Sequence, residues 1–340
     1  MEEAQFRNKI TWFTFLYSVL VIWVHSYNWE LFLGKTSQGQ TVAGFERFFG
    51  DFLGQIAVPG FFLISAYLFY RNFHITGLKA KWKSRAKSIL LPYLIWNGIY
   101  YMGYVIGSRM PFLSQVVGKG KIPFTARNLL DAVINYRYLY VFWYLQQLIF
   151  LVALAPVLYF VLKKIWRGLL FLTAVFWAVW VGADFPYLNE DALFYYSIGA
   201  FMAVHGRQWE KKWTKARCFW GCMLIGLGFL NLYLTRKFFL PGTTVLYRLF
   251  LPLGLWLATD ENRIKSPGSW MEYNFFLYAV HFAFVRLFNK TAAYLLPHHI
   301  LVPVILYLFM PGLMVGISFG LSFAVKKYTP GIWDVINGGR

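Results

Sequence analysis

The chain has 340 residues, of which 59% are hydrophobic and only 14% are charged. A soluble domain carries roughly 25% charged residues, so this composition excludes an ordinary soluble protein and indicates many membrane-spanning segments. The formal net charge of +19 falls in short clusters between apolar runs, a pattern that disfavours nucleic-acid binding and is typical of charged loops on one side of a lipid bilayer.

Apolar segments recur along the whole chain and predict an all-α, polytopic transmembrane bundle of about ten helices, forming a single domain over residues 1–340. The start, MEEAQFRNK, is followed by an apolar run without a small-residue cleavage site, so we expect a retained signal anchor. The predicted spans, in chain order, are 10–27, 53–70, 89–107, 138–162, 168–183, 192–205, 218–235, 243–259, 271–288 and 300–325.

Basic residues lie preferentially on one side of this topology. With the N-terminus in the cytoplasm, the cytoplasmic segments hold the larger share of the 33 Lys and Arg, including the long cluster at 71–88. The sequence therefore predicts cytoplasmic N- and C-termini in a plasma membrane. The segments 28–52 and 108–137 are then expected to be outer loops.

The first span carries an ionisable residue near its far end, His25. Thr11, Thr14 and Ser18 precede it at helical spacings, so the four side chains are predicted to share one polar face. For the hydroxyls alone, an interhelical hydrogen-bond seam is the simpler interpretation, whereas an intramembrane imidazole is costly and favours a functional role. At 1.5 Å per residue, His25 is expected about 22 Å above the inner edge of a core about 30 Å thick.

Few other polar residues lie inside the predicted spans. Tyr278 and His281 are three apart on the ninth span, with Asn274 on the same face, and His281 is expected deeper, about 12–15 Å above the inner edge. Arg248 and Arg286 lie near span ends, where snorkelling and functional roles are equally consistent. No Asp or Glu lies well inside a predicted span, which disfavours an ion-coupled carrier.

Two short motifs carry little weight. Cys218 and Cys222 lie four apart in one apolar segment without further ligands, so we interpret them as packing residues and predict neither a disulfide nor a metal site. Asn289 begins an Asn-Lys-Thr glycosylation sequon, a match that arises easily by chance.

Six fragments, in the right order on a ten-span chain, resemble the acyltransferase-3 family of integral membrane acyltransferases, bacterial enzymes that modify surface sugars and polymers. The fragments are VLVIWVHS, PGFFLISAYLFYR, SRAKSILLPYLIWN, FWYLQQLIFLVALAPVL, YYSIGAFMAV and FFLYAVHFAFV. The chain departs from the family pattern at two positions. Thr14 stands where the family often has an arginine, eleven residues before the histidine, and Ala66 stands where glycine is usual.

The resemblance implies transfer of an acyl group, most often acetyl, from cytoplasmic acyl-CoA to a hydroxyl of an extracytoplasmic sugar or surface polymer. It makes His25 the catalytic residue, as a general base or as a transient acyl carrier. Acyl-CoA is polyanionic, so Arg71, Arg85 and Lys87 are candidate donor-binding residues, although membrane anchoring also explains such charges. The side chains expected to line the substrate path or polarise the thioester are Ser65, Tyr67, Trp143, Arg248, Tyr278 and His281.

Two alternatives stay open at this point. A membrane transporter of a lipid-linked sugar or small solute would suit ten spans and a positive charge balance. A non-catalytic relative, serving as a subunit of a surface-polymer machine, would suit the departure at Thr14. Acyl-CoA is the donor that we expect, with no metal cofactor and no nucleic-acid partner. The sequence is compatible with a homo-oligomer and does not indicate the acceptor or the acyl chain.

Overall fold

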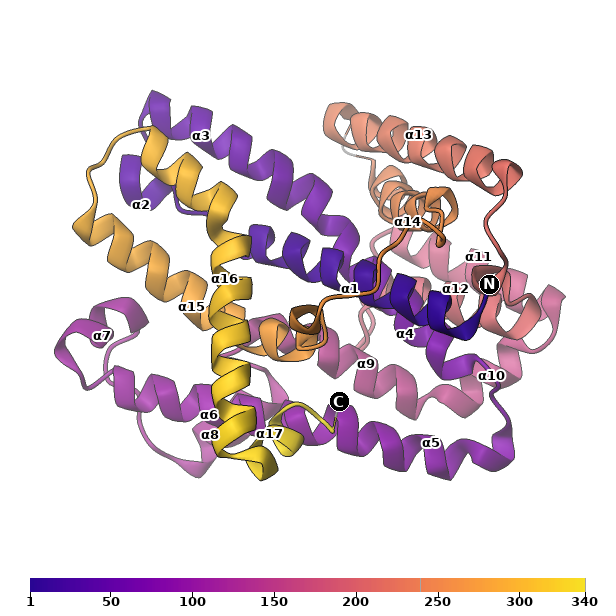
Figure 1. Ribbon diagram of the computed structural model, residues 1–340, viewed down its shortest axis with the longest axis horizontal. Coiled ribbons are helices and arrows are strands. Elements are labelled where there is room, and N and C mark those ends of the chain that lie inside the picture. Colours follow the sequence, from indigo (N-terminus) through magenta and orange to yellow (C-terminus); the bar gives the residue numbers. More distant parts are fainter. Residues whose placement is uncertain (239, 340) are drawn as a thin grey trace. The chain divides into compact units, whose positions relative to one another are not determined.

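The computed structural model describes residues 1–238 and 240–339, and this part of the chain is built from helices without strands (Figure 1). The predicted all-α class is therefore confirmed. Each predicted span coincides with a helix or a helix pair. These are α1 (Glu3–His25), α4 (Ala57–Tyr70), α6 (Leu91–Gly107), α9 (Trp143–Ala153) with α10 (Ala155–Leu162), α11 (Ile165–Trp180), α12 (Glu190–His205), α13 (Lys215–Phe238), α14 (Pro241–Ala258), α15 (Asn274–Leu295) and α16 (Leu301–Tyr328).

Length and apolar composition mark some of the described helices as able to cross a membrane. Five continuous stretches qualify, and α9 with α10 makes a sixth if this pair, bent by 65°, counts as one span. Pro156 at the start of α10 explains the bend, because proline lacks an N–H and its ring clashes with the preceding turn. The total of ten crossings stays a prediction. The five stretches are Glu3–Leu33, Ser37–Tyr70, Ile75–Gly107, Lys215–Phe238 and Leu301–Tyr328.

The segments expected to be outer loops contain short helices, and their place on the outer side stays a prediction. Residues 28–52 contain α2 (Trp29–Leu33) and α3 (Ser37–Arg47), and residues 108–137 contain α7 (Pro111–Val117) and α8 (Ala126–Ile134). Two threonines explain the helix starts, because Thr36 caps α3 by accepting from Gly39 N and Thr125 caps α8 by accepting from Asn128 N. These helices are too short or too polar for a hydropathy pattern to reveal them.

A buried carboxylate lies in the helical segment that precedes α4. Glu46, on α3, is 0% exposed and belongs to the continuous stretch Ser37–Tyr70 that is able to cross a membrane. Its Oε2 accepts a hydrogen bond from Asn28 N at 3.1 Å, and its backbone carbonyl accepts one from the Tyr307 hydroxyl at 2.9 Å. Glu46 lies before the predicted span 53–70, so the expectation of spans free of carboxylates stays a prediction.

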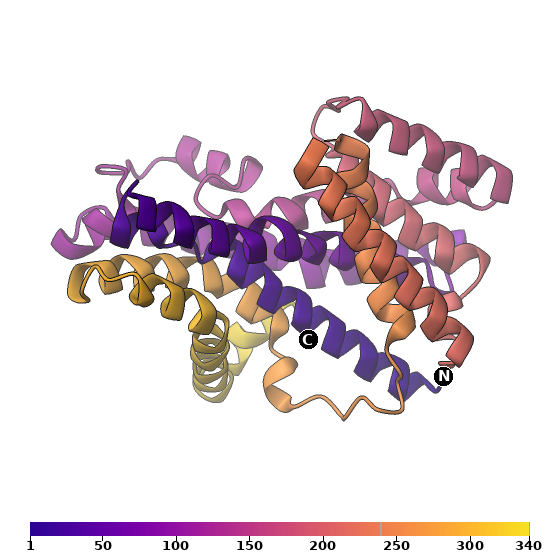
Figure 2. The ribbon, with the colours of Figure 1, turned by 90° about the horizontal axis from the view of Figure 1, so that it is seen from above.

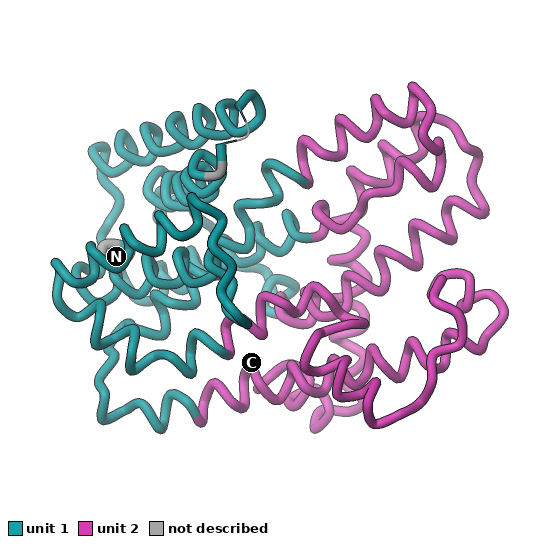
Figure 3. The backbone as a smooth tube through the Cα atoms, turned by 180° about the vertical axis from the view of Figure 1, so that it is seen from behind, with its two compact units in different colours: residues 1–21, 51–82, 150–272 teal, residues 22–50, 83–149, 273–340 magenta. Residues whose placement is uncertain are grey.

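The chain divides into two compact units, each drawn from three separate stretches (Figure 3). Most of α1, up to Val21, belongs to unit 1, and its last turn belongs to unit 2. The single domain expected over residues 1–340 stays a prediction. Unit 1 comprises Met1–Val21, Asp51–Trp82 and Phe150–Glu272, and unit 2 comprises Ile22–Gly50, Lys83–Ile149 and Tyr273–Arg340.

Small residues bring the helices of unit 1 close together. A Cβ at Gly199 of α12 would lie 2.4 Å from the Leu63 carbonyl oxygen of α4, so only glycine permits this approach. The same applies to Gly221, where α13 packs along α14 (Figure 2) and an added Cβ would lie 2.5 Å from Ala258 N. Neither cysteine of α13 forms a disulfide; Cys218 is half-buried, while Cys222 is exposed instead of packed.

Unit 2 is built on α6, α15 and α16, which carry the aromatic and polar side chains that position the candidate site. The Tyr100 hydroxyl of α6 donates to the Ala279 carbonyl of α15 at 2.8 Å. Trp96, one turn earlier on α6, donates to the Ile336 carbonyl of α17 (Pro330–Ile336) at 2.9 Å. These buried bonds tie α6 to α15 and to α17.

We expect both termini and residues 71–88 to face the cytoplasm, because cytoplasmic segments hold most of the basic residues. After Cys218 and Cys222 are replaced by serine, a membrane-impermeant maleimide added from outside should label Lys121→Cys and miss Ala80→Cys. Both positions are exposed. Lys121 is a better site than Gly120, whose φ of +66° strains any side chain. The reverse labelling pattern would contradict the predicted topology.

Candidate active site

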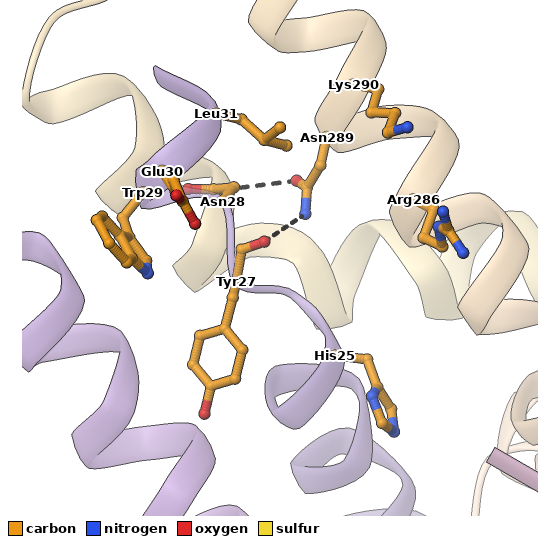
Figure 4. Close-up of a pocket in the computed structure, with 9 residues that line it drawn as sticks. All are labelled: His25, Tyr27, Asn28, Trp29, Glu30, Leu31, Arg286, Asn289 and Lys290. Carbon is orange, nitrogen blue, oxygen red and sulfur yellow. Dashed lines mark hydrogen bonds between the residues drawn. The ribbon is translucent and has the colours of Figure 1, made fainter. Parts of the chain in front are cut away.

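His25 is the last residue of α1, and hydrogen bonds to the next residues determine where that helix ends (Figure 4). Asn289 of α15 donates from Nδ2 to the Ser26 carbonyl at 3.0 Å and lies at 3.5 Å from the Tyr27 carbonyl. Asn28 in turn donates to Asn289 Oδ1 at 3.4 Å. These contacts turn the chain away from the helix directly after His25, which leaves the imidazole at an open helix end.

The imidazole of His25 has a tyrosine partner. Its Nδ1 lies 2.8 Å from the hydroxyl of Tyr140, in the short turn η5 (Tyr140–Phe142), and the two rings meet edge to face with centroids 5.3 Å apart. The ring of Phe282 on α15 lies 5.9 Å away. Tyr140 therefore restrains the imidazole, and its hydroxyl can either accept a proton from Nδ1 or donate one to it.

A second histidine lies beside the first. The His281 and His25 ring centroids are 5.6 Å apart, and His281 is 1% exposed. His281 Nδ1 lies 2.7 Å from the Tyr278 carbonyl, which can only accept, so Nδ1 carries a proton and donates it. Its Nε2 is buried without a hydrogen-bond partner among the described residues. A neutral His281 thus keeps an unused acceptor close to His25.

This proximity corrects the expected depths. We expected His25 about 22 Å and His281 about 12–15 Å above the inner membrane edge. A ring separation of 5.6 Å is smaller than that difference. Counting residues along ideal upright helices ignores helix tilt and side-chain direction, which together bring the two rings to one place.

A pocket opens beside His25. Its volume is about 320 Å³, near the lower end of the range for small-ligand sites. Figure 4 shows Arg286 and Lys290 on α15 at one side of it, while Asn289 between them turns toward Asn28 and Tyr27. The lining residues are His25, Tyr27, Asn28, Trp29, Glu30, Leu31, Arg286, Asn289 and Lys290.

Tyr278 and Trp143 belong to the same unit as His25. The Tyr278 ring stacks on Phe142 with centroids 5.5 Å apart, and its hydroxyl donates to the Val141 carbonyl. Trp143 begins α9 directly after η5 and is half-buried. Of the residues predicted to surround His25, the structure thus brings His281 against it, with Tyr278 one turn before.

Arg71 is engaged by carboxylates of unit 1. Its Nε lies 2.9 Å from Glu210 Oε1, and its Nη2 lies 2.6 Å from Glu3 Oε2. The Tyr67 hydroxyl donates to the same Glu210 carboxylate at 2.9 Å. A guanidinium held by two carboxylates offers little to a phosphate, so this geometry argues against Arg71 as a donor ligand and places Tyr67 in the same ion-pair cluster.

Arg248 is likewise part of an internal ion pair. Its Nη1 lies 3.3 Å from Asp191 Oδ2, and its Nη2 donates to Gln55 Oε1 at 3.4 Å. The arginine is therefore not a snorkelling side chain. Ser65 lies half-buried on α4, also in unit 1. The roles of Arg248 and Ser65 in a substrate path stay predictions.

The two remaining residues expected to bind acyl-CoA, Arg85 and Lys87, lie at a π-helical turn in unit 2. Arg85 is the last residue of α5 (Leu78–Arg85), and Lys87 lies in η4 (Ala86–Leu90), which leads into α6. Lys87 is exposed and Arg85 is half-buried. Such π-helical turns occur frequently at functional sites, and this one presents two cations at the start of α6.

The polar face expected on α1 is only partly formed. The hydroxyls of Thr11 and Thr14 donate to the Arg7 and Ile10 carbonyls, one turn back in their own helix, at 3.1 and 2.9 Å. Ser18 is 2% exposed, and its hydroxyl has no partner among the described residues. Thr14 therefore provides no substitute for the arginine that the family often has at its position.

Sequence reasoning missed the importance of Tyr140 and Asn289. Tyr140 lies at the edge of a predicted span among many aromatics, and no local signal distinguishes it. Asn289 did stand out, but as the first residue of a glycosylation sequon. At 3% exposure, with its amide bonded to the Ser26 carbonyl, it is a structural residue and not a glycan acceptor.

Within residues 1–238 and 240–339, no three His, Cys, Asp or Glu side chains lie close enough together to hold a metal ion. The expectation that no metal takes part stays a prediction. The cations Arg85 and Lys87, which precede α6, could hold an anionic acyl donor. The residues that line the His25 pocket could hold a neutral or anionic acceptor.

Comparison with known proteins agrees with this architecture. Residues 9–323 match the family model described as an acyltransferase domain. The chain is similar to the succinoglycan biosynthesis protein ExoH of Rhizobium meliloti (strain 1021), with 28% identity over 201 residues, which are 55% of this chain and 51% of that protein. The chain thus spans about half the length of the curated relative that it matches. No solved structure matches it. Because the family model covers nearly all of the sequence, the chain belongs to the acyltransferase-3 family.

Proposed function

We propose that this protein is a membrane O-acyltransferase that moves an acyl group, with acetyl as the first candidate, from cytoplasmic acyl-CoA to a hydroxyl of an extracytoplasmic glycan. Family membership supports acyl transfer, and the printed role of the relative in succinoglycan biosynthesis supports a polysaccharide acceptor. The observation that carries the proposal is His25, which lines a pocket at an open helix end with Tyr140 bonded to its Nδ1.

As a general base, His25 would hold a proton on Nδ1, donate it to the Tyr140 oxygen and leave Nε2 free. Nε2 then takes the proton of the acceptor hydroxyl while that oxygen attacks the thioester carbon. The C–S bond of the tetrahedral intermediate breaks, and the leaving thiolate takes the proton from the imidazolium. The products are the ester and free CoA-SH, and His25 returns to its neutral state.

As an acyl carrier, Nε2 would itself attack the thioester carbon; the C–S bond then breaks, and the thiolate leaves as CoA-SH with the Nδ1 proton. The acceptor hydroxyl would then attack the acyl-imidazole, form the ester and return its proton to the imidazole. In both cases His281 acts as a positioning residue. Its Nδ1 proton is held by the Tyr278 carbonyl, and its free Nε2 lies on a ring 5.6 Å from that of His25. Packed beside His25, the His281 ring restrains that imidazole in its place at the pocket.

Membranes that contain the protein are expected to transfer label from acetyl-CoA, labelled in the acetyl group, to an outer-surface glycan as an alkali-labile ester. Membranes that lack the protein are the control. Uptake of a solute without ester label would support the transporter alternative instead. A change in polymer output without any label would support the non-catalytic alternative, for which the departure at Thr14 is the motivating observation. Label confined to cytoplasmic products would contradict the proposed acceptor side.

A further inference from the structure

Unit 2 contains a second hollow that shares Arg286 with the His25 pocket. It has a volume of about 350 Å³ and lies between α6, α7 and α15. Its lining is mostly apolar and includes Trp96, Ile99, Leu113, Val280 and Leu287. Arg286 is the cationic residue of this lining and also lines the His25 pocket, so an apolar groove and a polar pocket meet at one guanidinium.

The groove follows the axis of α6. Its lining extends from Trp96 to Gly107, about 16 Å at 1.5 Å per residue. Gly103 lies midway along this lining and has no side chain. The space beside it is open, because an added Cβ would have no atom within 4 Å. Ile99 is 45% exposed along the same wall. An apolar hollow of this length, parallel to a helix able to span a membrane, suits a single lipid chain.

Cations gather at the Gly107 end of this groove. Arg286 Nη1 donates to the Tyr104 hydroxyl at 2.9 Å, and Lys290 Nζ donates to the Val116 carbonyl at 2.7 Å. Lys119 Nζ lies 5.6 Å from the centroid of the Tyr104 ring. Their polar partners are therefore neutral.

None of the three cations has a carboxylate within 4 Å in the described part of the chain. By contrast, Arg137 of the same unit pairs with Asp131 at 2.7 Å. Burial and then the positive charges of Arg286 and Arg137 lower the pKa of Lys119, as expected where cations are not neutralised. The cluster therefore lacks an anion.

We propose that the groove and this cationic cluster (Lys119, Arg286 and Lys290) bind the anchor of a lipid-linked acceptor, with its apolar chain in the groove and its phosphate at the cluster. This inference rests on the proposed function and names the acceptor class: a glycan attached through phosphate to a long apolar chain. Since Arg286 lines both hollows, a sugar attached to that phosphate would enter the His25 pocket. An ordinary phospholipid would leave that pocket unused.

The acyl-pantetheine arm of the donor is the main competing occupant. Its nucleotide phosphates are expected at Arg85 and Lys87, which precede α6, whereas the cationic cluster lies at the opposite end of that helix. The 17 residues of α6 separate the two positions by about 25 Å. Charge complementarity thus places the phosphate of the groove ligand at the end of α6 away from the donor-binding candidates.

The test is a binding measurement on the full-length protein in nanodiscs of neutral phosphatidylcholine, with radiolabelled geranylgeranyl monophosphate as the probe. We expect saturable binding that unlabelled geranylgeraniol, inorganic phosphate and phosphatidylglycerol compete for at least tenfold less well than unlabelled probe. Arg286→Gln with Lys290→Gln should weaken binding at least tenfold, because two charge-assisted contacts are lost. Arg286→Lys, which keeps the positive charge, should weaken probe binding less. This single variant provides the measurement if the double variant does not fold.

A matched pair of glycine variants tests the groove. Gly103→Leu should weaken probe binding about fivefold or more by filling the groove. Gly98→Leu should not, because Gly98 lies on the same helix with equally open space around its Cβ position but does not line the groove. Lys237→Gln on α13 is the charge control.

Several results would overturn the inference. They are equal competition by geranylgeraniol, equal competition by phosphatidylglycerol, stronger competition by an acyl-pantetheine than by unlabelled probe, and equal effects of the two glycine variants. The assay involves no acyl transfer. Failure of the lipid anchor site is therefore separable from failure of the proposed acyltransferase function, which the labelled acetyl-CoA experiment tests.

Discussion

Replacing His25 with alanine is expected to lower acyl transfer by about 10²- to 10⁴-fold, the usual contribution of general acid–base catalysis. The imidazole borders an open pocket, so its removal should leave protein level and detergent stability nearly unchanged. The measurement is the initial rate of ester formation from labelled acetyl-CoA with purified protein in nanodiscs. His74→Ala is the matched control, because His74 is exposed outside the site.

Two neighbouring substitutions sharpen this result. Tyr140→Phe removes the hydroxyl at 2.8 Å from His25 Nδ1 but keeps the ring, so it should cause a smaller loss and shift the pH dependence of the rate. His281→Ala should also reduce transfer, since its ring lies against that of His25. Near-normal transfer by His25→Ala, together with loss in His281→Ala, would place the catalytic centre at His281.

The base and carrier roles of His25 can be separated in the same assay. Without acceptor, an acyl carrier should retain label on the wild-type protein after the reaction is quenched, and His25→Ala should not. A general base should leave both proteins unlabelled, because no covalent bond to the enzyme forms.

The double substitution Arg85→Ala with Lys87→Ala is expected to raise the KM for acetyl-CoA at least tenfold and to leave kcat and folding intact. Each hydrogen bond to a charged group contributes about 1.5–3 kcal/mol, and two such contacts would be lost. The measurement is the dependence of the initial rate on acetyl-CoA concentration. The effect should shrink as salt is added, because exposed charges are screened.

Lys79→Ala with Lys83→Ala is the matched control, since both lysines are exposed on the same helix α5. If both double variants change KM equally, the basic segment acts through general charge. If neither changes it, Arg85 and Lys87 serve to anchor the segment at the membrane surface.

Much of the architecture follows from local properties of the sequence. Apolar runs such as 10–27 and 300–325 have the length and hydropathy of membrane helices, and α1 and α16 form there. His25 was identifiable because an ionisable residue in such a run is unusual, and the spacing of its neighbouring motif residues matches the family. Short helices such as α3 were not identifiable, because their caps and polar faces give no hydropathy signal.

The helical class, the family and the histidine that the proposed chemistry needs can all be read from local sequence patterns. Which side chains surround that histidine depends on the tertiary structure. Tyr140 lies 115 residues further along the chain, and its contact with His25 depends on how η5 packs near the end of α1. The same holds for Arg71. Its charge suggested that it binds a phosphate of the donor, but in the structure it pairs with Glu3 and Glu210. Hydropathy and charge are properties of single segments, whereas hydrogen bonds and ion pairs depend on which distant segments meet, and packing alone determines that.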